Sequence, residues 1–177
     1  MDGDVSDDQM SRYIRRIQLG IRFLGHGARA NTTCQWTSLT PDQLVTVRRR
    51  SRFSTSERLR GPSPSSFATF FRSNRTRGQA ALFLSICQVV GPTRSTRSVE
   101  NGEKLCEAFE VFREWEPESD FDFEQAVLLM DGAGCGVSLA FVNCSSCSCP
   151  LVVDTLGDTQ DVCHWCRRGS TKMIATA

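Results

Sequence analysis

Nine cysteines carry the strongest chemical signal in this chain, because four of them form two closely spaced pairs. One pair is Cys144-Ser-Ser-Cys147, and fifteen residues separate it from the second pair, Cys163-His-Trp-Cys166. Two residues between cysteines let a tight turn aim both thiolates at one ion, and this separation of the pairs is typical of four-cysteine zinc sites. We therefore predict that Cys144, Cys147, Cys163 and Cys166 bind one Zn²⁺ per chain.

Four thiolate ligands leave no open coordination position, so the predicted zinc is structural and does not activate water. Cys149 is an alternative to Cys147 that needs a longer reach, and we rank Cys147 ahead of it. A redox role for a single pair is the competing interpretation, but no thioredoxin-like pattern surrounds either pair. The four remaining cysteines are predicted to be small buried hydrophobic residues: Cys34, Cys87, Cys106 and Cys135.

Signatures of catalysis are missing from the sequence. It contains no HExxH, no glycine-rich loop followed by lysine, no GxSxG and no histidine placed to serve a nucleophile. His26 and His164 are predicted to be structural, and the acidic residues from Glu114 to Glu124 are predicted to form a solvated linker. We predict that the chain is not an enzyme and has no small-molecule substrate.

Charge is distributed unevenly, with sixteen arginines against seven acidic residues in the first hundred positions. The segment from Val47 to Arg77 has nine arginines and a single acidic residue, Glu57. Arginine suits bidentate contact with phosphates and guanine edges, so this segment predicts DNA binding. RNA, an acidic protein or a solvated loop from a GC-rich genome would fit the same charge. The predicted DNA-binding residues are Arg48, Arg49, Arg50, Arg52, Arg58, Arg60, Arg72, Arg75 and Arg77.

No export or membrane signal accompanies these features. The first ten residues contain four aspartates and no apolar run, unlike a secretory signal. The longest nearly apolar stretch, residues 80–90, is much shorter than the roughly 18 to 20 residues that span a bilayer. We expect no membrane association and a cytoplasmic protein, in which paired cysteines bind metal more often than they form disulfides.

Apolar periodicity and capping residues predict a mainly α-helical fold. The predicted helices cover residues 11–29, a segment that starts at Thr40, and residues 66–72, 76–90, 98–115 and 122–130. The first helix is predicted to bury one face, made of Ile14, Ile17, Ile21, Leu24 and Ala28. Glycines at 132, 134 and 136 are expected to stop the last helix. Residues 137–142 are predicted to be a strand, and residues 151–153 with a Gly157-Asp158 turn a hairpin that returns the second cysteine pair.

These elements predict a multi-helix domain followed by a small C-terminal zinc-ribbon-like module with four cysteine ligands. The expected boundaries are a flexible acidic N-terminus over 1–10, a helical DNA-binding and partner-binding domain over 11–136, a zinc-binding module over 137–169 and a flexible tail over 170–177.

Several motifs, in this order, resemble the flagellar transcriptional regulator FlhC family. They are Gly27-Ala28-Arg29, the helix started at Thr40, Leu59-Arg60-Gly61 followed by Pro62 and Pro64, and the paired CxxC motifs. The similarity extends over residues 11–169, and its most specific part is the segment from Leu139 to Cys147 with the second cysteine pair. The chain departs from the family in a shortened segment after Gly61, a short tail and few lysines.

The resemblance implies a zinc-containing transcriptional activator subunit that joins an FlhD-type subunit in a hetero-oligomer at flagellar operon promoters. It implies double-stranded promoter DNA and RNA polymerase as further partners, and it places the family's zinc cysteines on Cys144, Cys147, Cys163 and Cys166. The alternative is a zinc-stabilised protein-interaction module, or a divergent regulator that has lost flagellar DNA binding.

Overall fold

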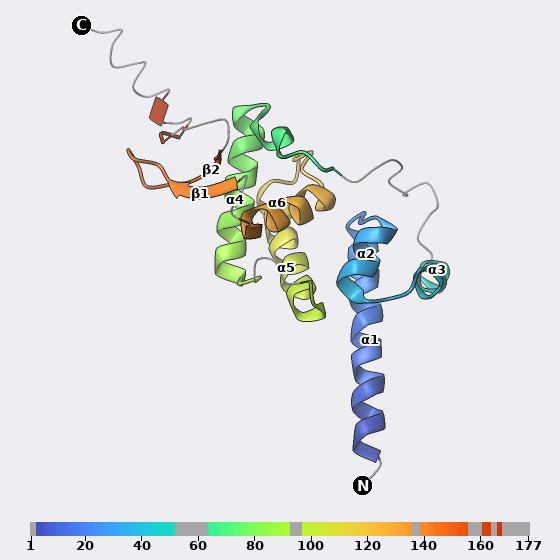
Figure 1. Ribbon diagram of the computed structural model, residues 1–177. Coiled ribbons are helices and arrows are strands. Elements are labelled where there is room, and N and C mark those ends of the chain that lie inside the picture. Colours follow the sequence, from blue (N-terminus) through green and yellow to red (C-terminus); the bar gives the residue numbers. More distant parts are fainter. Residues whose placement is uncertain are drawn as a thin grey trace, which may run out of the picture.

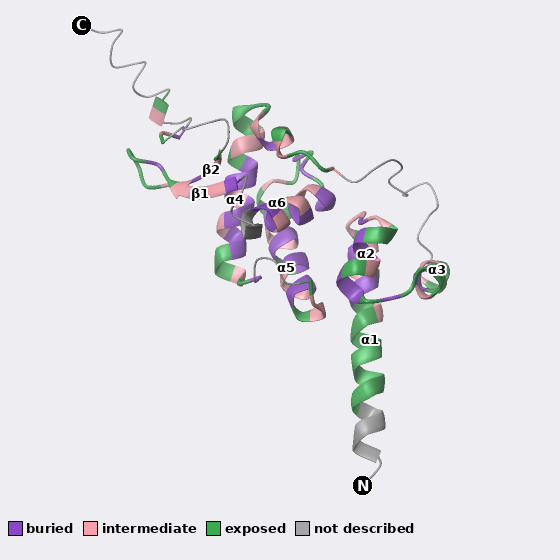
Figure 2. Ribbon diagram, in the orientation of Figure 1, coloured by how far each residue is buried: buried purple, intermediate pink, exposed green. Residues whose placement is uncertain are grey.

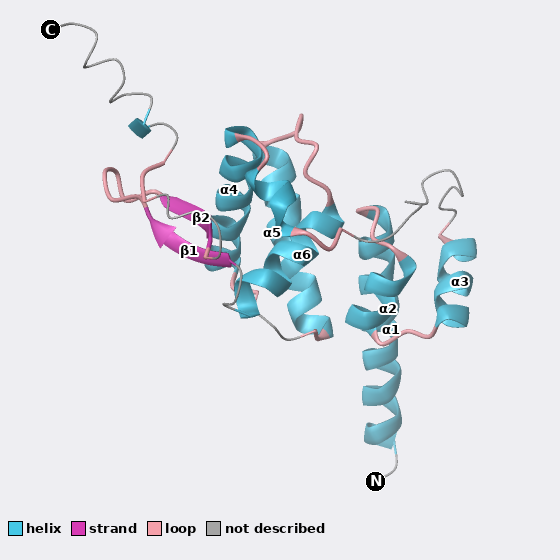
Figure 3. Cartoon of the chain, turned by 45° about the horizontal axis from the view of Figure 1, so that its top comes forward, coloured by secondary structure: helices cyan, strands magenta, loops and turns pink. Residues whose placement is uncertain are grey.

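The computed structural model describes residues 3–51, 64–92, 97–135, 139–155, 161–163 and 166–167 (Figure 1). The described elements are α1 (Gly3–Gly25), α2 (Ala30–Thr37), α3 (Pro41–Arg50), the 3₁₀ helix η2 (Phe67–Phe71), α4 (Asn74–Val90), α5 (Val99–Trp115), α6 (Phe123–Cys135), β1 (Leu139–Asn143) and β2 (Pro150–Asp154). The described part of the chain is therefore mainly α-helical, as the sequence predicts, and it has one hairpin near its C-terminal end (Figure 3).

Helix α1 begins at Gly3, so the acidic segment expected to be flexible is helical from that residue onward. Acidic residues near a helix N-terminus are favourable because they oppose the positive end of the helix dipole. Asp8 also forms an ion pair with Arg12, one turn later on the same face. Local electrostatics therefore extend the helix beyond the apolar periodicity from which residues 11–29 were predicted.

The buried face of α1 differs from most of the predicted face, of which only Ala28, beyond the end of the helix, enters the main core. Leu19 and Phe23 are the residues of α1 that enter the main core, at 1% and 0% exposure. Ile14 and Ile21, expected inside, are 47% and 37% exposed. Ile17 packs only against a small second cluster beside α3. The helix has apolar residues on two sides, and periodicity alone did not decide which side meets the core.

Helix α2 was not predicted from the sequence, because it is short, rich in threonine and lacks a side-chain cap of its own. Its cap comes from α6 instead: the Glu124 carboxylate accepts hydrogen bonds from the Arg29 backbone N–H at 2.8 Å and from the Thr32 hydroxyl at 3.0 Å. Glu124 is only 3% exposed, so the prediction of a solvated acidic linker is wrong at this residue. A buried carboxylate is tolerable here because hydrogen bonds satisfy it.

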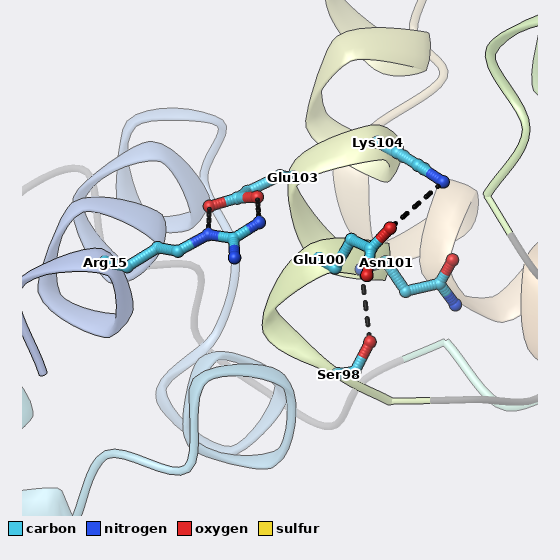
Figure 4. Close-up of polar contacts among 6 residues, drawn as sticks. All are labelled: Arg15, Ser98, Glu100, Asn101, Glu103 and Lys104. Carbon is cyan, nitrogen blue, oxygen red and sulfur yellow. Dashed lines mark hydrogen bonds and ion pairs between the residues drawn. The ribbon is translucent and has the colours of Figure 1, made fainter. Parts of the chain in front are cut away.

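Capping chemistry places the starts of the other helices. As predicted, Thr40 and Gln43 form a reciprocal capping box before α3. Ser98 caps α5, also as predicted, by accepting a hydrogen bond from the Asn101 N–H (Figure 4). Helix α4 begins at Asn74, two residues before the predicted start, because Ser73 and Thr76 form a second capping box. Unsatisfied backbone N–H groups at a helix start explain why these hydroxyl residues determine it.

Aromatic rings fill the core between α4, α5 and α6. Phe83 and Phe112 meet edge to face at 5.9 Å between centroids, and Phe109 meets Phe123 in the same way at 5.1 Å. All four are no more than 5% exposed. Such pairs add to the free energy gained from apolar burial, so this cluster stabilises the packing of the three helices.

Helix α6 runs through Gly132, where the sequence predicted that glycines would stop it. A Cβ at this position would lie 2.3 Å from a ring carbon of Phe67. The glycine therefore lets η2 pack directly on α6, and tertiary contact outweighs the low helix propensity of glycine.

Charged side chains join α1 to α5 across their outer edges. Arg15 donates to Glu103 at 2.7 Å, as Figure 4 shows, and Arg22 donates to Glu110 at 2.9 Å. The His26 ring lies 2.9 Å from Glu110. Leu19 and Phe23 of α1 lie against Gly102 of α5, so apolar burial and ion pairs stabilise the same helix contact.

Candidate metal centre

The β1–β2 hairpin positions the first cysteine pair. The two strands are antiparallel, with Leu139 opposite Asp154 and Asn143 opposite Pro150. Residues 144–149 therefore form the hairpin connection itself. The sequence had placed the turn at Gly157-Asp158, which lies outside the described residues. Because β2 begins directly after Cys149, three cysteines stand in one short connection.

Four sulfur atoms converge at this connection. The Sγ atoms of Cys144, Cys147, Cys149 and Cys163 all lie within 4.8 Å of one another. The Cys147 and Cys163 sulfurs are 3.6 Å apart. Thiolates around one zinc at about 2.3 Å lie about 3.8 Å from each other, whereas disulfide sulfurs are about 2.05 Å apart. The spacing fits a shared metal ion, and every described cysteine is a free thiol.

Backbone N–H groups support these sulfurs. The Cys163 N–H donates to the Cys144 Sγ at 3.2 Å, and the Cys166 N–H donates to the Cys163 Sγ at 3.4 Å. The Ser145 N–H donates to the Asp161 carbonyl at 2.8 Å and ties the two pairs together. Hydrogen bonds of this kind orient metal ligands and stabilise their negative charge.

These hydrogen bonds favour a thiolate in each pair. The Cys163 N–H lowers the pKa of the Cys144 thiol to about 6. Burial alone would raise the pKa of Cys163, but the Cys166 N–H and the neighbouring thiols outweigh it and lower that pKa. Because a metal binds the thiolate, the lowered pKa of one cysteine in each pair favours coordination.

Cys166 lies outside this group of four sulfurs but interacts with its members. Its side chain interacts with Ser146, which favours the thiolate, and with Cys147 and Cys163, whose larger combined effect raises the pKa of Cys166 to about 12. The group of sulfurs within 4.8 Å of one another therefore contains three of the predicted ligands, Cys144, Cys147 and Cys163, and has Cys149 where Cys166 was expected. The sequence offered Cys149 only as an alternative to Cys147, whereas the hairpin places both cysteines in the same connection.

The isolated cysteines lie elsewhere. Cys87 and Cys106 are buried in the main core, as predicted, and burial raises the pKa of Cys106 to about 12. Cys34 is half-buried beside the small cluster at α3. The side chain of Cys135 lies outside the described residues, and so does His164. His26 has a structural environment, because its ring stacks on Phe123 at 5.3 Å between centroids.

The nine predicted DNA-binding arginines do not all remain available. Arg52, Arg58 and Arg60 lie outside the described residues. Arg75 donates to the Glu118 carbonyl at 3.0 Å, and the Arg77 guanidinium covers the Phe71 ring at 5.2 Å. The remaining described members are the half-buried Arg48 and the exposed Arg49, Arg50 and Arg72.

The described arginines lie on two separate parts of the molecule. Arg48, Arg49 and Arg50 form the last turn of α3, which packs on α1 and α2, whereas Arg75 and Arg77 lie on α4, which packs on α5 and β2. Both ribbon views place α3 and α4 on opposite sides of α2 (Figures 1 and 3).

No protein-family model matches this chain, and no curated protein shows significant similarity to it. Among the described helices, none is long and apolar enough to cross a membrane. The cysteine cluster is therefore the feature from which a function must be inferred.

Proposed function

We propose that this chain is a DNA-binding transcriptional activator subunit of the FlhC type, stabilised by one structural Zn²⁺ and acting with an FlhD-type subunit at flagellar promoters. The observation that carries this proposal is the group of cysteine thiols at the hairpin connection, near the C-terminal end of a helical, arginine-rich chain. The motif order that resembles the FlhC family supplies the flagellar assignment and RNA polymerase as the recruited partner.

Zinc is the metal that best suits the site. An all-sulfur set of four ligands favours soft or borderline ions, and it leaves no place for a reacting water. The ion would join two segments that are distant in the sequence, the hairpin connection and the residues from Cys163 to Cys166. Its role would be to hold the fold together beside α4.

The end of α3 is the part of the basic segment that we assign to DNA. Arg49 and Arg50 are exposed, and the chain continues from them toward Arg52, Arg58 and Arg60. Arg49 and Arg50 also lie in the last turn of α3, at the negative end of the helix dipole. Their positive charge therefore also stabilises the helix.

Helix α1 supplies the surface that we assign to the partner subunit. Its N-terminal half projects from the body of the molecule, and the side chains of residues 8–16 are exposed (Figure 2). The exposed apolar residues recur at helical spacing and form one row: Met10, Tyr13, Ile14 and Ile21. Apolar side chains exposed to water do not stabilise the helix. A row of them on a projecting helix therefore favours burial against the helical surface of a partner.

A gel-shift series tests the DNA part of this proposal. The chain, co-expressed with an FlhD-type subunit, should bind flagellar promoter DNA with an affinity that falls as salt rises. Replacing Arg49 and Arg50 with alanine should weaken binding and reduce the slope of log affinity against log salt by about 2. Arg97→Ala is the matched control, because Arg97 is exposed but hydrogen-bonds to Asp131 and Gln35. Equal slopes for both variants would contradict the assignment.

A zinc-stabilised protein-interaction module is the second candidate. It is favoured by the internal use of Arg75 and Arg77 and by the apolar row on α1. This function predicts a stable complex with the partner and no salt-dependent shift of duplex DNA.

A further inference from the structure

Helices α2 and α3 are joined by a short turn of defined conformation. Helix α2 ends at Thr37 and α3 begins at Pro41, so only three residues connect them. The first of these, Ser38, has a left-handed backbone with φ of 56°, a conformation that favours glycine, and short turns between two helices often contain glycine. The Ser38 N–H donates to the Cys34 carbonyl at 2.9 Å, and the Leu39 N–H donates to the Thr37 hydroxyl at 3.2 Å. These hydrogen bonds fix the direction in which α3 leaves α2.

A small apolar cluster, separate from the main core, holds this helix pair against α1. Its members come from the turn, from both helices and from α1: Leu39, Leu44, Val47, Ile17, Leu24 and Cys34. Leu39 of the turn is 3% exposed and lies against Gly20 of α1, where a Cβ would be 3.0 Å from its Cδ1 atom. Figure 1 views α3 nearly along its axis and α1 from the side, so the two helix axes cross. Two helices, a three-residue turn and a supporting helix around one small core are the parts of a helix-turn-helix unit.

Burial of one side of α3 leaves its other side free. Leu44 and Val47 face the small cluster, at 2% and 6% exposure. The exposed side chains recur at spacings of three and four and therefore share one face: Asp42, Val45, Thr46 and Arg49. Val45 is 45% exposed although it is apolar. Helix α3 stands at the outer edge of the described helices, so this face is open to a large partner (Figure 3).

We propose that α3 is a recognition helix that enters the major groove of duplex DNA. Asp42, Val45 and Thr46 contact base edges there, whereas Arg49 and Arg50 contact the phosphates beside the groove. This inference rests on the DNA-binding part of the proposed function, and it adds which element reads the sequence and from which groove. In helix-turn-helix units the N-terminal residues of the second helix reach the bases. The order of side chains along α3 fits this geometry, because the three base-reading residues precede the arginines of the last turn.

The chemistry of these side chains suits the major groove. This groove presents the thymine methyl group and the cytosine amino group, and the minor groove presents neither. Val45 would bury its exposed apolar surface against the methyl group, and the Asp42 carboxylate would accept from the amino group. A carboxylate is repelled by phosphates, so Asp42 fits a place among base edges. The Thr46 hydroxyl donates to the Asp42 carbonyl at 3.1 Å and keeps its lone pairs to accept from a base. Duplex RNA has a major groove too deep and narrow for side chains to read, so the partner is DNA.

Binding of promoter DNA and of random-sequence duplex by the full chain, co-expressed with an FlhD-type subunit, tests the role of α3. The Val45→Ala/Thr46→Ala double variant should bind promoter DNA about 5- to 150-fold more weakly, the loss expected when contacts to one base pair are removed. Its affinity for random duplex and its salt dependence should not change, because base contacts specify and phosphate contacts position. Val89→Ala, which shortens a valine of α4 that is 88% exposed, is the matched control and should leave both affinities unchanged.

Promoter DNA with deoxyuridine in place of thymine gives a second readout that does not require any variant to fold. This change removes the methyl group from the major groove and leaves base pairing and charge intact. The wild-type complex should bind this DNA more weakly than thymine-containing DNA, and the double variant should show a smaller difference. Equal binding of the two DNAs by the wild type, or an undiminished preference of the double variant for promoter DNA, would overturn the recognition helix and leave DNA binding itself intact. A wild-type complex that binds no duplex DNA would instead overturn the DNA-binding part of the proposed function.

Discussion

Gly132 shows how much one residue controls where two helices meet. Its missing side chain leaves space for the Phe67 ring, and the helix continues through it although glycine is a poor helix former. Gly78, in the exposed face of α4, has the opposite environment, because a Cβ there would meet nothing within 4 Å. The two glycines therefore allow one substitution to be compared in two settings.

Gly132→Ala should destabilise the protein by about 1 to 3 kcal/mol, because the new methyl group overlaps a ring that the core holds in place. Gly78→Ala should stabilise it by about 0.5 to 1 kcal/mol, since alanine favours the helix and finds open space. Denaturant unfolding of both variants measures the free energies. Equal effects at the two positions would show that the contact with Phe67 does not restrict Gly132.

At the scale of elements, the contact between α1 and α5 combines burial with charge. Partial burial alone would raise the pKa of Glu110, but hydrogen bonds from Arg22 and His26 outweigh it and lower that pKa. A carboxyl group whose folded-state pKa is lowered stabilises the protein above its unfolded pKa of about 4.3, and the contribution disappears as pH falls through the folded-state value. The contact should therefore weaken in acid.

The Glu110→Gln variant should lose less stability than the wild type when pH falls from 6 toward 3. The difference should be about 0.2 to 1 kcal/mol, because the Glu110 side chain is 43% exposed and water screens its pairs. Thermal unfolding across this pH range measures it. Parallel curves for the two proteins would mean that Glu110 has no part in the acid sensitivity.

Because the apolar row on α1 is exposed, a substitution in it should prevent partner binding without changing the stability of the chain. Ile14→Asp should change the free energy of unfolding by no more than about 0.5 kcal/mol, as for other exposed positions. It should nevertheless prevent co-purification with the FlhD-type subunit, because it places a charge in an apolar contact. Ser11→Asp adds the same charge to an exposed position of α1 outside the row, and it should leave co-purification intact.

At the scale of the whole molecule, the helical core and the metal centre are separate apolar clusters that meet through the hairpin. The aromatic core of α4, α5 and α6 contains none of the cysteines that converge at the hairpin connection, whereas Leu139 and Val152 of the hairpin belong to it. Metal binding should therefore stabilise the C-terminal end without being required for the helices.

Zinc removal by a chelator under reducing conditions should lower the melting temperature and expose the hairpin while most of the helical circular dichroism signal remains. Small zinc modules lose roughly 10 kcal/mol or more of apparent binding free energy without their ion, so the hairpin connection should not stay folded alone. Hydrogen exchange of residues 139–155 measures the local effect. Collapse of the helical signal together with zinc loss would contradict two separable clusters.

The sequence by itself determined the helical class, the starts of α3 and α5, and the segments that carry the thiols. These depend on local chemistry: a hydroxyl residue that caps a helix, and two intervening residues that aim two sulfurs in one direction. Only the tertiary structure decided which face of α1 is buried, why α2 forms beside Glu124, and that Cys149 joins the cluster. Each of these depends on a contact between distant segments, whose energy no local pattern contains.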